Sequence, residues 1–262
     1  MRTQRALAYG ILVVLSVAMT PVEAAQCQAR SGPHTTALVE LYTSEGCDSC
    51  PPADRWLQGL AGRGLAPDRV VPLSLHVNYW DYIGWKDPYA QQRFADRQRK
   101  LAQVMRARIV YTPQVLLQGR DFRNWGGRAF EEAVARINAR PPRAAISLAL
   151  AGRQADTLAV EVRAELLVPG EEAEAALYLA SYENRLVSRV AAGENRGRTL
   201  SHDYVVFEWL GPFAFAAGRA EERRTLPLLP KAVLANSGAA AFVQNRRTGE
   251  VLQALMLPAC PG

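Results

Sequence analysis

The chain has 262 residues, of which 49% are hydrophobic and 21% charged, an ordinary balance for a globular protein. Its 31 Lys and Arg residues outnumber its 25 Asp and Glu residues, and the arginines are spread along the chain, often beside acidic residues. Because the sequence shows no basic tract with interleaved aromatic residues, this composition argues against nucleic-acid binding and predicts a solvated basic surface.

The N-terminal segment has the pattern of a signal peptide. Arg2 and Arg5 form a basic start, residues 6–19 an apolar core, and Val22-Glu23-Ala24 a small-residue cleavage signal. The apolar core is short for a membrane-spanning helix. We therefore expect residues 1–24 to be removed and the rest to be exported, without a membrane anchor, into the periplasm or the medium, where disulfides form.

Two cysteines, Cys47 and Cys50, lie where a predicted buried strand over residues 38–42 gives way to a predicted helix over residues 53–60. A helix N-terminus carries unpaired N–H groups and partial positive charge, which favour a thiolate over a thiol. A thiolate is the attacking species in disulfide exchange. We expect Cys47 to attack and Cys50 to resolve the mixed disulfide.

Other interpretations of this cysteine pair stay open. In an exported protein the pair can form an inert structural disulfide. Half of a zinc site is disfavoured, because zinc takes four ligands and the sequence has no second close cysteine pair. Soft thiolates also bind Cu(I), although the four methionines and three histidines of the chain are not clustered. We therefore assign no metal ligands.

The first half of the chain alternates predicted strands and helices. The segment after Thr112 and Pro113 reads as an apolar strand, and Pro141-Pro142 marks the end of the unit. The predicted order is β-α-β-α-β-β-α, with strands over residues 38–42, 70–77, 114–117 and 121–125 and helices over residues 53–60, 89–108 and 128–139.

An aromatic loop follows the second of these strands and contains Tyr79, Trp80, Asp81 and Trp85. Clustered aromatic side chains on a loop can form a binding surface, and they can equally pack between two parts of a core. Both alternatives stay open. Asp81 and Asp87 can accept protons or cap the following helix, and capping is the favoured role, above all for Asp87 beside Pro88.

Two histidines have less specific surroundings. His76 lies in a strand pattern, so we expect a core histidine with its hydrogen bonds satisfied. His202 is expected at the start of a strand in the second half, where a structural hydrogen bond is favoured over a metal site.

The second half changes to short strands with alternating polarity. Residues 157–166 alternate apolar side chains with Glu161, Arg163 and Glu165, as in a half-buried antiparallel strand. Such a run of strands predicts a small antiparallel β-sandwich, with strands over residues 144–150, 157–166, 175–182, 186–190, 204–209, 224–229, 240–244 and 251–257.

Two further cysteines lie near the chain ends. In an oxidising compartment, Cys27 and Cys260 are expected to form a structural disulfide that ties the ends together. Free thiols, or Cys27 as an additional resolving thiol, are the alternatives.

The strand–CxxC–helix unit followed by Thr-Pro before a strand resembles the thioredoxin-like fold. The resemblance implies that Pro113 is cis and faces Cys47 and Cys50, and that Thr112 and Pro113 shape a groove for an extended substrate segment. It implies an α/β thioredoxin-like domain over residues 25–142, followed by the antiparallel β-sandwich domain over residues 143–262.

A narrower resemblance rests on residues 39–54, 79–87, 111–114 and 193–200 together with His202. These segments are similar to a family of exported thioredoxin-like proteins catalogued as domain of unknown function 1223. Departures from ordinary thioredoxins are Gly46 in place of a tryptophan and the carboxylates Glu45 and Asp48 beside Cys47. Like charge disfavours a thiolate, so we expect Cys47 to be less acidic than in strongly oxidising CxxC proteins.

These patterns together predict an exported thiol–disulfide oxidoreductase that acts on protein thiols or disulfides. The sequence shows no flavin or nicotinamide fingerprint, so no cofactor is expected, and a separate redox partner protein would supply the reducing equivalents. The alternative is a non-enzymatic protein that binds a peptide or partner and in which the Cys47–Cys50 disulfide is structural.

Overall fold

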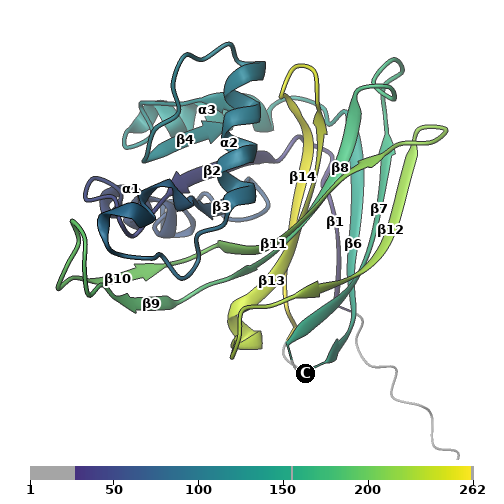
Figure 1. Ribbon diagram of the computed structural model, residues 1–262. Helices are drawn as coiled ribbons and strands as arrows, with labels where there is room; N and C mark the ends of the chain where they lie inside the picture. Colours follow the sequence, from purple (N-terminus) through teal and green to yellow (C-terminus); the bar gives the residue numbers. More distant parts are fainter. Residues whose placement is uncertain (1–26, 155, 261–262) are drawn as a thin grey trace, which may run out of the picture.

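The computed structural model describes residues 27–154 and 156–260 (Figure 1). The predicted signal peptide lies outside these residues. The first half follows the predicted element order with β2 (Ala37–Thr43), α1 (Pro51–Gln58), β3 (Val70–His76), α2 (Gln92–Val104), β4 (Gln114–Leu117), β5 (Arg120–Asp121) and α3 (Arg128–Asn138). Three 3-10 helices are η1 (Ala61–Arg63), η2 (Asn78–Ile83) and η3 (Leu234–Asn236). The remaining strands are β1 (Cys27–Arg30), β6 (Ala144–Gln154), β7 (Thr157–Leu166), β8 (Ala175–Glu183), β9 (Leu186–Arg189), β10 (Thr199–His202), β11 (Val205–Ala214), β12 (Arg219–Pro227), β13 (Ser237–Asn245) and β14 (Val251–Pro258).

One eight-stranded sheet runs through both halves of the chain in the order β14-β13-β8-β11-β3-β2-β4-β5. Strand β11 joins the halves, because it pairs antiparallel with β8 and parallel with β3, where Val205 lies opposite Ser74. The backbone N–H of Ser74 donates to the carbonyl of Tyr204 at 2.8 Å. The change in sequence pattern after residue 142 therefore does not separate the two halves in space, because both contribute strands to one sheet.

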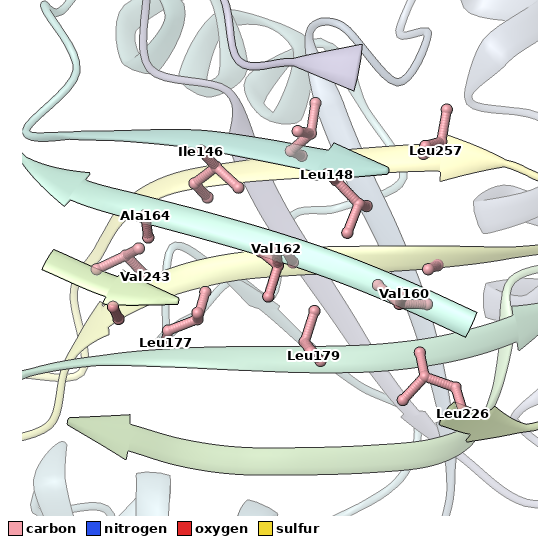
Figure 2. Packing of buried hydrophobic residues seen from close by; sticks show 14 of the residues in the cluster. Ile146, Leu148, Val160, Val162, Ala164, Leu177, Leu179, Leu226, Val243 and Leu257 are labelled. Carbon is pink, nitrogen blue, oxygen red and sulfur yellow. The ribbon is translucent and has the colours of Figure 1, made fainter. Parts of the chain in front are cut away.

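A second sheet has the order β1-β6-β7-β12 and packs face to face against the far end of the large sheet. Figure 2 shows the apolar side chains that fill the space between them, among them Leu148, Val162 and Leu179. The predicted alternation in β7 is confirmed, because Leu158, Val160, Val162 and Ala164 are buried there. Strand β1 was not predicted, and it pairs with β6.

The large sheet is covered on both faces, which explains why its central strands are apolar throughout. Side chains of β2 and β3 alternate between one hydrophobic cluster on each face of the sheet. Side chains of β8 and β13 alternate in the same way between the first of these clusters and a third one. One cluster includes Phe94, Ala95 and Leu101 of α2. On the opposite face, α1 and α3 cover β2, β3 and β4, and the four-stranded sheet covers β8, β13 and β14. Helix α2 thus spans both halves on its face of the sheet (Figure 1).

Helix α2 is shorter than predicted and begins at Gln92 instead of residue 89. The backbone groups before it are already used, because the N–H of Tyr89 donates to Asp87 and the N–H of Gln91 donates to the carbonyl of His76. These bonds hold the preceding turn against β3. The predicted strand over residues 121–125 is likewise reduced to β5, after which the chain turns toward α3.

A small two-stranded sheet of β9 and β10 stands apart from the two larger ones and was missed in part, since β10 was not predicted. It extends beneath α1 in Figure 1 and contacts that helix. The hairpin therefore brings residues of the second half to the cysteine pair of the first. Over the described residues, no helix combines the length and apolar character that crossing a membrane requires.

Candidate functional site: a buried CxxC disulfide

Cys47 and Cys50 form a disulfide in the loop between β2 and α1. Cys50 is the N-cap of α1, and Pro51 and Pro52 occupy the first turn, where no N–H partner is required. The carbonyl of Cys50 accepts hydrogen bonds from the N–H groups of Ala53 and Asp54. The second pair, Cys27 and Cys260, is also disulfide-bonded, as predicted.

Neither cysteine of the CxxC pair is open to solvent. The exposed fraction is 1% for Cys47 and 0% for Cys50. The attacking role predicted for Cys47 assumes that the first cysteine of the pair is the more exposed, but the structure buries both. Asp48 and Ser49 between them are exposed, so the loop reaches the surface through its two polar residues.

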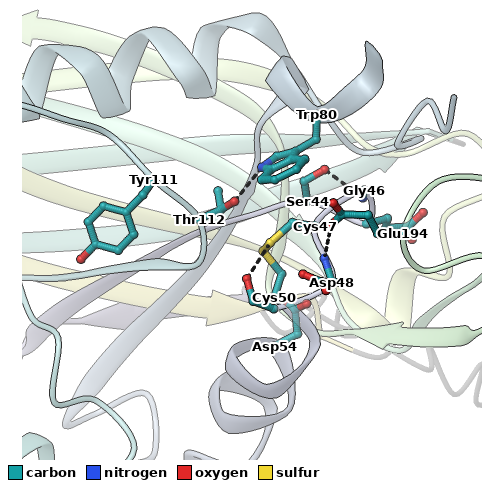
Figure 3. Close-up of a disulfide and its surroundings, with 12 residues drawn as sticks. Ser44, Gly46, Cys47, Asp48, Cys50, Asp54, Trp80, Tyr111, Thr112 and Glu194 are labelled. Atoms are coloured by element: carbon teal, nitrogen blue, oxygen red, sulfur yellow. Dashed lines mark hydrogen bonds between the residues drawn. A yellow bond between two sulfur atoms is a disulfide. The ribbon is translucent and has the colours of Figure 1, made fainter. Parts of the chain in front are cut away.

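One cover over the disulfide is the aromatic loop. The indole N–H of Trp80 donates to Thr112 Oγ1 at 2.7 Å, and Figure 3 shows the ring between Thr112 and Ser44 on one side of the cysteine loop. Gly46 allows this packing, since a Cβ at that position would lie 2.9 Å from Trp80 Cβ. Trp85 donates its indole N–H to Glu45 Oε2 at 2.8 Å. These two tryptophans therefore pack onto the cysteine loop.

The loop between β9 and β10 forms the other cover. Asn195, which is fully buried, donates from Nδ2 to the carbonyls of Glu45 at 2.8 Å and Cys47 at 2.9 Å. The N–H of Asp48 donates to Glu194 Oε2 at 3.1 Å. Sequence reasoning assigned no role to Asn195 or Glu194, although both lie in the 193–200 segment that carried the resemblance. Their position depends on the β9–β10 hairpin, which the sequence did not show.

Five ionisable side chains from separate segments form a buried acid–base cluster beside the cysteine loop. They are Glu45, Asp54, His76, Asp87 and His202, each at most 5% exposed. His76 Nδ1 lies 2.7 Å from Asp87 Oδ2, and His202 Nε2 lies 3.1 Å from Glu45 Oε1. The two imidazole rings meet edge to face with centroids 4.9 Å apart.

The acid–base cluster changes the roles expected for three of its members. His202 was expected at the start of a sandwich strand, but it ends β10 and reaches the CxxC loop through Glu45. Asp87 was expected to cap the helix, but it instead binds His76 and accepts the backbone N–H of Glu45 at 2.8 Å. His76 is buried as predicted, yet its Nε2 has no hydrogen-bond partner among the described residues.

Burial and mutual charge shift the protonation of the acid–base cluster. Burial raises the pKa of Asp54, and this outweighs the lowering influence of His202 and His76. For His76, burial acts downward but the adjacent Asp87 raises the pKa overall. For Asp87, burial acts upward but His76 and two backbone N–H groups lower the pKa overall. The two opposite shifts favour the charged forms of His76 and Asp87, whereas the shift of Asp54 favours its protonated form.

The Thr112–Pro113 bond is cis, as the resemblance implied. Pro113 lines a surface cavity of about 370 Å³ together with Ile109, Tyr111, Arg123 and Trp125. The guanidinium of Arg123 lies 5.7 Å from the centre of the Tyr111 ring. This apolar groove with a cationic side chain begins at the residue next to Thr112, which contacts Trp80.

The described residues contain no group of three or more His, Cys, Asp or Glu side chains arranged to hold a metal ion.

Comparison with known proteins places the chain in a family. A search of curated proteins finds no significant match. Among solved structures, it is similar to a protein from Agrobacterium tumefaciens, with 25% identity and a TM-score of 0.61, over 87% of this chain and 96% of that one. It also shares its fold with HBP35 of Porphyromonas gingivalis, at 16% identity and a TM-score of 0.65, over 87% of this chain and 76% of that one. The sequence model described as "Protein of unknown function (DUF1223)" matches residues 38–244, and the chain therefore belongs to the DUF1223 family.

Proposed function

We propose that this protein exchanges thiols and disulfides with other proteins through Cys47 and Cys50. The observation that carries the proposal is the Cys47–Cys50 disulfide at the N-terminus of α1, with Thr112 beside it and cis-Pro113 next in the chain. A helix N-terminus stabilises a cysteine thiolate, which is the reactive species. The resemblance to thioredoxin-like proteins supports the same chemistry.

The exchange conserves electrons in two steps. The Cys47 thiolate attacks a substrate disulfide, so that a Cys47–substrate bond forms and the other substrate sulfur leaves as a thiolate. The Cys50 thiolate then attacks Cys47 Sγ, which forms the Cys47–Cys50 disulfide and releases the second substrate thiol. The substrate has gained two electrons and the pair has lost two. A separate dithiol protein restores the reduced pair, and the reverse sequence oxidises a substrate dithiol.

An extended protein segment fits the surroundings better than a small molecule does. The groove from Pro113 to Trp125 is open and apolar and has Arg123 at its side. Thr112 and Pro113 would align the segment, while the groove holds an apolar side chain of the substrate. The predicted signal peptide and the oxidising compartment that it implies are consistent with exported protein substrates.

Exchange requires that one cover moves, because Cys47 is buried. The Trp80 indole is held by a single hydrogen bond to Thr112, and the 193–198 loop is held mainly through Asn195. Opening either contact leaves the large sheet intact. A substrate segment that binds beside Thr112 competes for the hydroxyl that holds Trp80.

The same burial favours a second candidate function. A disulfide with both sulfurs buried is typical of a structural bond, and the protein would then bind a peptide or partner without redox chemistry. The two functions predict different reduction potentials for the Cys47–Cys50 pair.

Equilibration of the mature protein with glutathione measures this potential. A value between about −120 and −270 mV lies in the range of working oxidoreductases and supports exchange. A value below about −300 mV is typical of structural disulfides and would leave partner binding as the function.

Activity toward a protein disulfide provides the second measurement. We expect Cys47→Ser to abolish exchange, whereas the Cys27→Ser/Cys260→Ser double variant retains it, since the terminal disulfide lies outside the site. Equal exchange by Cys47→Ser and the unmodified protein would refute the proposal.

A further inference from the structure

Three polar atoms of the acid–base cluster have no hydrogen-bond partner within the described part of the chain. They are Asp54 Oδ1, His76 Nε2 and His202 Nδ1, and all are buried. His202 Nδ1 lies 4.0 Å from the other carboxyl oxygen of Asp54. An unpaired buried polar group costs free energy, so atoms left in this way call for an explanation.

Asp54 is the member of the acid–base cluster that is placed toward Cys50. It lies four residues after Cys50 on α1, and its N–H donates to the Cys50 carbonyl at 3.2 Å. Side chains four apart on a helix share a face, and a helical side chain leans toward the N-terminus. The Asp54 side chain therefore leans toward the turn that carries Cys50, as Figure 3 shows for the two labelled residues.

The two other carboxylates of the acid–base cluster are already occupied. Glu45 contacts His202 with one oxygen and Trp85 with the other. Asp87 accepts from the N–H of Tyr89 with Oδ1, and its Oδ2 is bound by His76 and by the N–H of Glu45. Asp54 is thus the carboxyl with the fewest partners. The Thr43 hydroxyl acts on it and lowers its pKa, while its Oδ1 makes no hydrogen bond of normal geometry within the described residues.

Opening the disulfide creates a demand for a proton at Cys50. When a thiolate attacks Cys47, the electron pair of the broken S–S bond stays on Cys50 Sγ. Cys50 is 0% exposed, so this charge forms away from water, where an unpaired charge is expensive. A neighbouring acid that delivers a proton removes the charge at once.

We propose that Asp54, supported by His202, gives a proton to Cys50 Sγ when the Cys47–Cys50 disulfide opens and takes it back when the disulfide re-forms. This inference rests on the proposed exchange function and adds the proton path. An incoming thiolate bonds to Cys47, the Cys47–Cys50 bond breaks, and the proton of the Asp54 carboxyl moves to Cys50. The second thiolate of the donor then displaces Cys47 and closes the donor disulfide.

The electrostatics of the acid–base cluster agree with this assignment. Burial raises the pKa of Asp54 and so favours its protonated form, against the lowering influence of His202, His76 and the Thr43 hydroxyl. The groups that face it are His202 from β10, His76 from β3, Glu45 from the cysteine loop and Asp87 from the loop before α2, with Tyr89 packed edge-on against both imidazoles. The carboxylate left on Asp54 after transfer lies beside the imidazole of His202, whose Nδ1 is 4.0 Å from Asp54 Oδ2.

The test is the rate at which dithiothreitol reduces the disulfide in the mature chain between about pH 5 and 9, corrected for the reagent's own thiolate fraction. The variants are Asp54→Asn and the control Asp96→Asn, whose carboxylate is 61% exposed on α2. We expect the corrected rate of the unmodified protein to fall as pH rises, and Asp54→Asn to be at least about tenfold slower at the acidic end and to lose that profile. Asp96→Asn should match the unmodified protein. A folded Asp54→Asn with the unmodified rate and profile would overturn the inference.

Carboxyl-carbon NMR of the unmodified protein decides the question without a variant. If Asp54 and Cys50 share a proton, the Asp54 titration midpoint differs between the oxidised and reduced protein, and a purely structural carboxyl would not show this. Identical Asp54 titrations in both states would also overturn the inference.

The proposed exchange function and the proposed role of Asp54 are refuted by different results. If dithiothreitol does not reduce the pair in the unmodified folded protein, the exchange function fails. If reduction proceeds and Asp54→Asn keeps its rate and profile, exchange stands and only the role of Asp54 is lost.

Discussion

The two disulfides of this protein have contrasting surroundings. Cys27–Cys260 closes a span of 233 residues, joins β1 to the segment after β14, and leaves Cys260 exposed. Cys47–Cys50 closes a span of three residues, is fully buried, and lies beside the acid–base cluster. The two bonds therefore differ in exposure, in the length of chain that they close and in their neighbours, and the proposed exchange at Cys47–Cys50 depends on the acid–base cluster beside it rather than on exposure.

Loop length predicts which disulfide stabilises the fold more. In the chain-entropy model, removing Cys27–Cys260 with a double Ser substitution lowers the free energy of unfolding by about 5 kcal/mol, and removing Cys47–Cys50 lowers it by about 2 kcal/mol. Guanidinium unfolding of the two double variants measures both. The reverse order would mean that Cys47–Cys50 is the principal structural bond, which favours the partner-binding function.

The acid–base cluster predicts a large loss of stability for Asp87→Asn. Removing one partner of a buried charged pair leaves His76 uncompensated and costs about 3 kcal/mol. Because the pKa of Asp87 is lowered in the fold, its contribution is present above the unfolded value of about 3.9 and is lost as pH falls through the folded value. Because the pKa of His76 is raised, its contribution is present below about 6.5 and is lost as pH rises through the folded value.

The deficit of Asp87→Asn is therefore expected to be largest between about pH 4 and 6.5, measured by urea unfolding against the control Asp96→Asn. A deficit that does not change with pH would show that packing, not charge, explains the loss.

Local patterns in the sequence predicted the elements that carry the cysteine pair. The strand before Cys47, the helix after Cys50 and the alternation in β7 depend on residues close in the chain, and the structure has them. The cis bond before Pro113 came from the resemblance. These features need no knowledge of how distant segments meet.

The acid–base cluster depends on distant segments, and the sequence did not reveal it. Glu45 and His202 are 157 residues apart, and Asn195 reaches Cys47 across 148 residues. Their approach follows from the pairing of β11 with β3, which extends one sheet across the expected domain boundary and directs the β9–β10 hairpin toward α1. A single sequence carries no signal for that pairing beyond apolar strands.

The cover formed by Asn195 is expected to control access to the CxxC pair. Asn195→Ala removes two buried hydrogen bonds, and within the described residues only the Cys47 carbonyl keeps a backbone donor, the N–H of Cys50 at 3.2 Å, so the loss costs about 2 kcal/mol. We expect faster reduction of Cys47–Cys50 by dithiothreitol, because the loop opens more often. Asn124→Ala, at an exposed site before α3, is the control. An unchanged reduction rate in Asn195→Ala would mean that Trp80 alone limits access.

Gly46 tests the other cover with a smaller change. In Gly46→Ala the new methyl group would lie 2.9 Å from Trp80 Cβ and 3.4 Å from the Trp80 carbonyl oxygen, so the backbone of the aromatic loop must shift, at a cost of about 1–2 kcal/mol. The Trp80–Thr112 hydrogen bond weakens, and alkylation of the reduced Cys47 becomes faster. Gly62→Ala is the matched control, since a Cβ there meets nothing within 4 Å. Equal alkylation rates in both variants would contradict the predicted cover.

Of these substitutions, Asp54→Asn is expected to change the free energy of unfolding least. The pH dependence of its effect is expected to be opposite to that of the Asp87 carboxylate. The folded pKa of Asp54 is raised, so its stabilising contribution is present below about pH 3.9 and is lost as pH rises through the folded value. The stability of the unmodified protein relative to Asp54→Asn should therefore fall from acidic to alkaline pH in urea unfolding. A difference that is constant with pH would contradict the raised pKa. Asparagine carries no charge at alkaline pH, so we expect Asp54→Asn to be the more stable protein there. A carboxyl group that lowers the stability of the fold at alkaline pH is better explained by a role in proton transfer than by a role in folding.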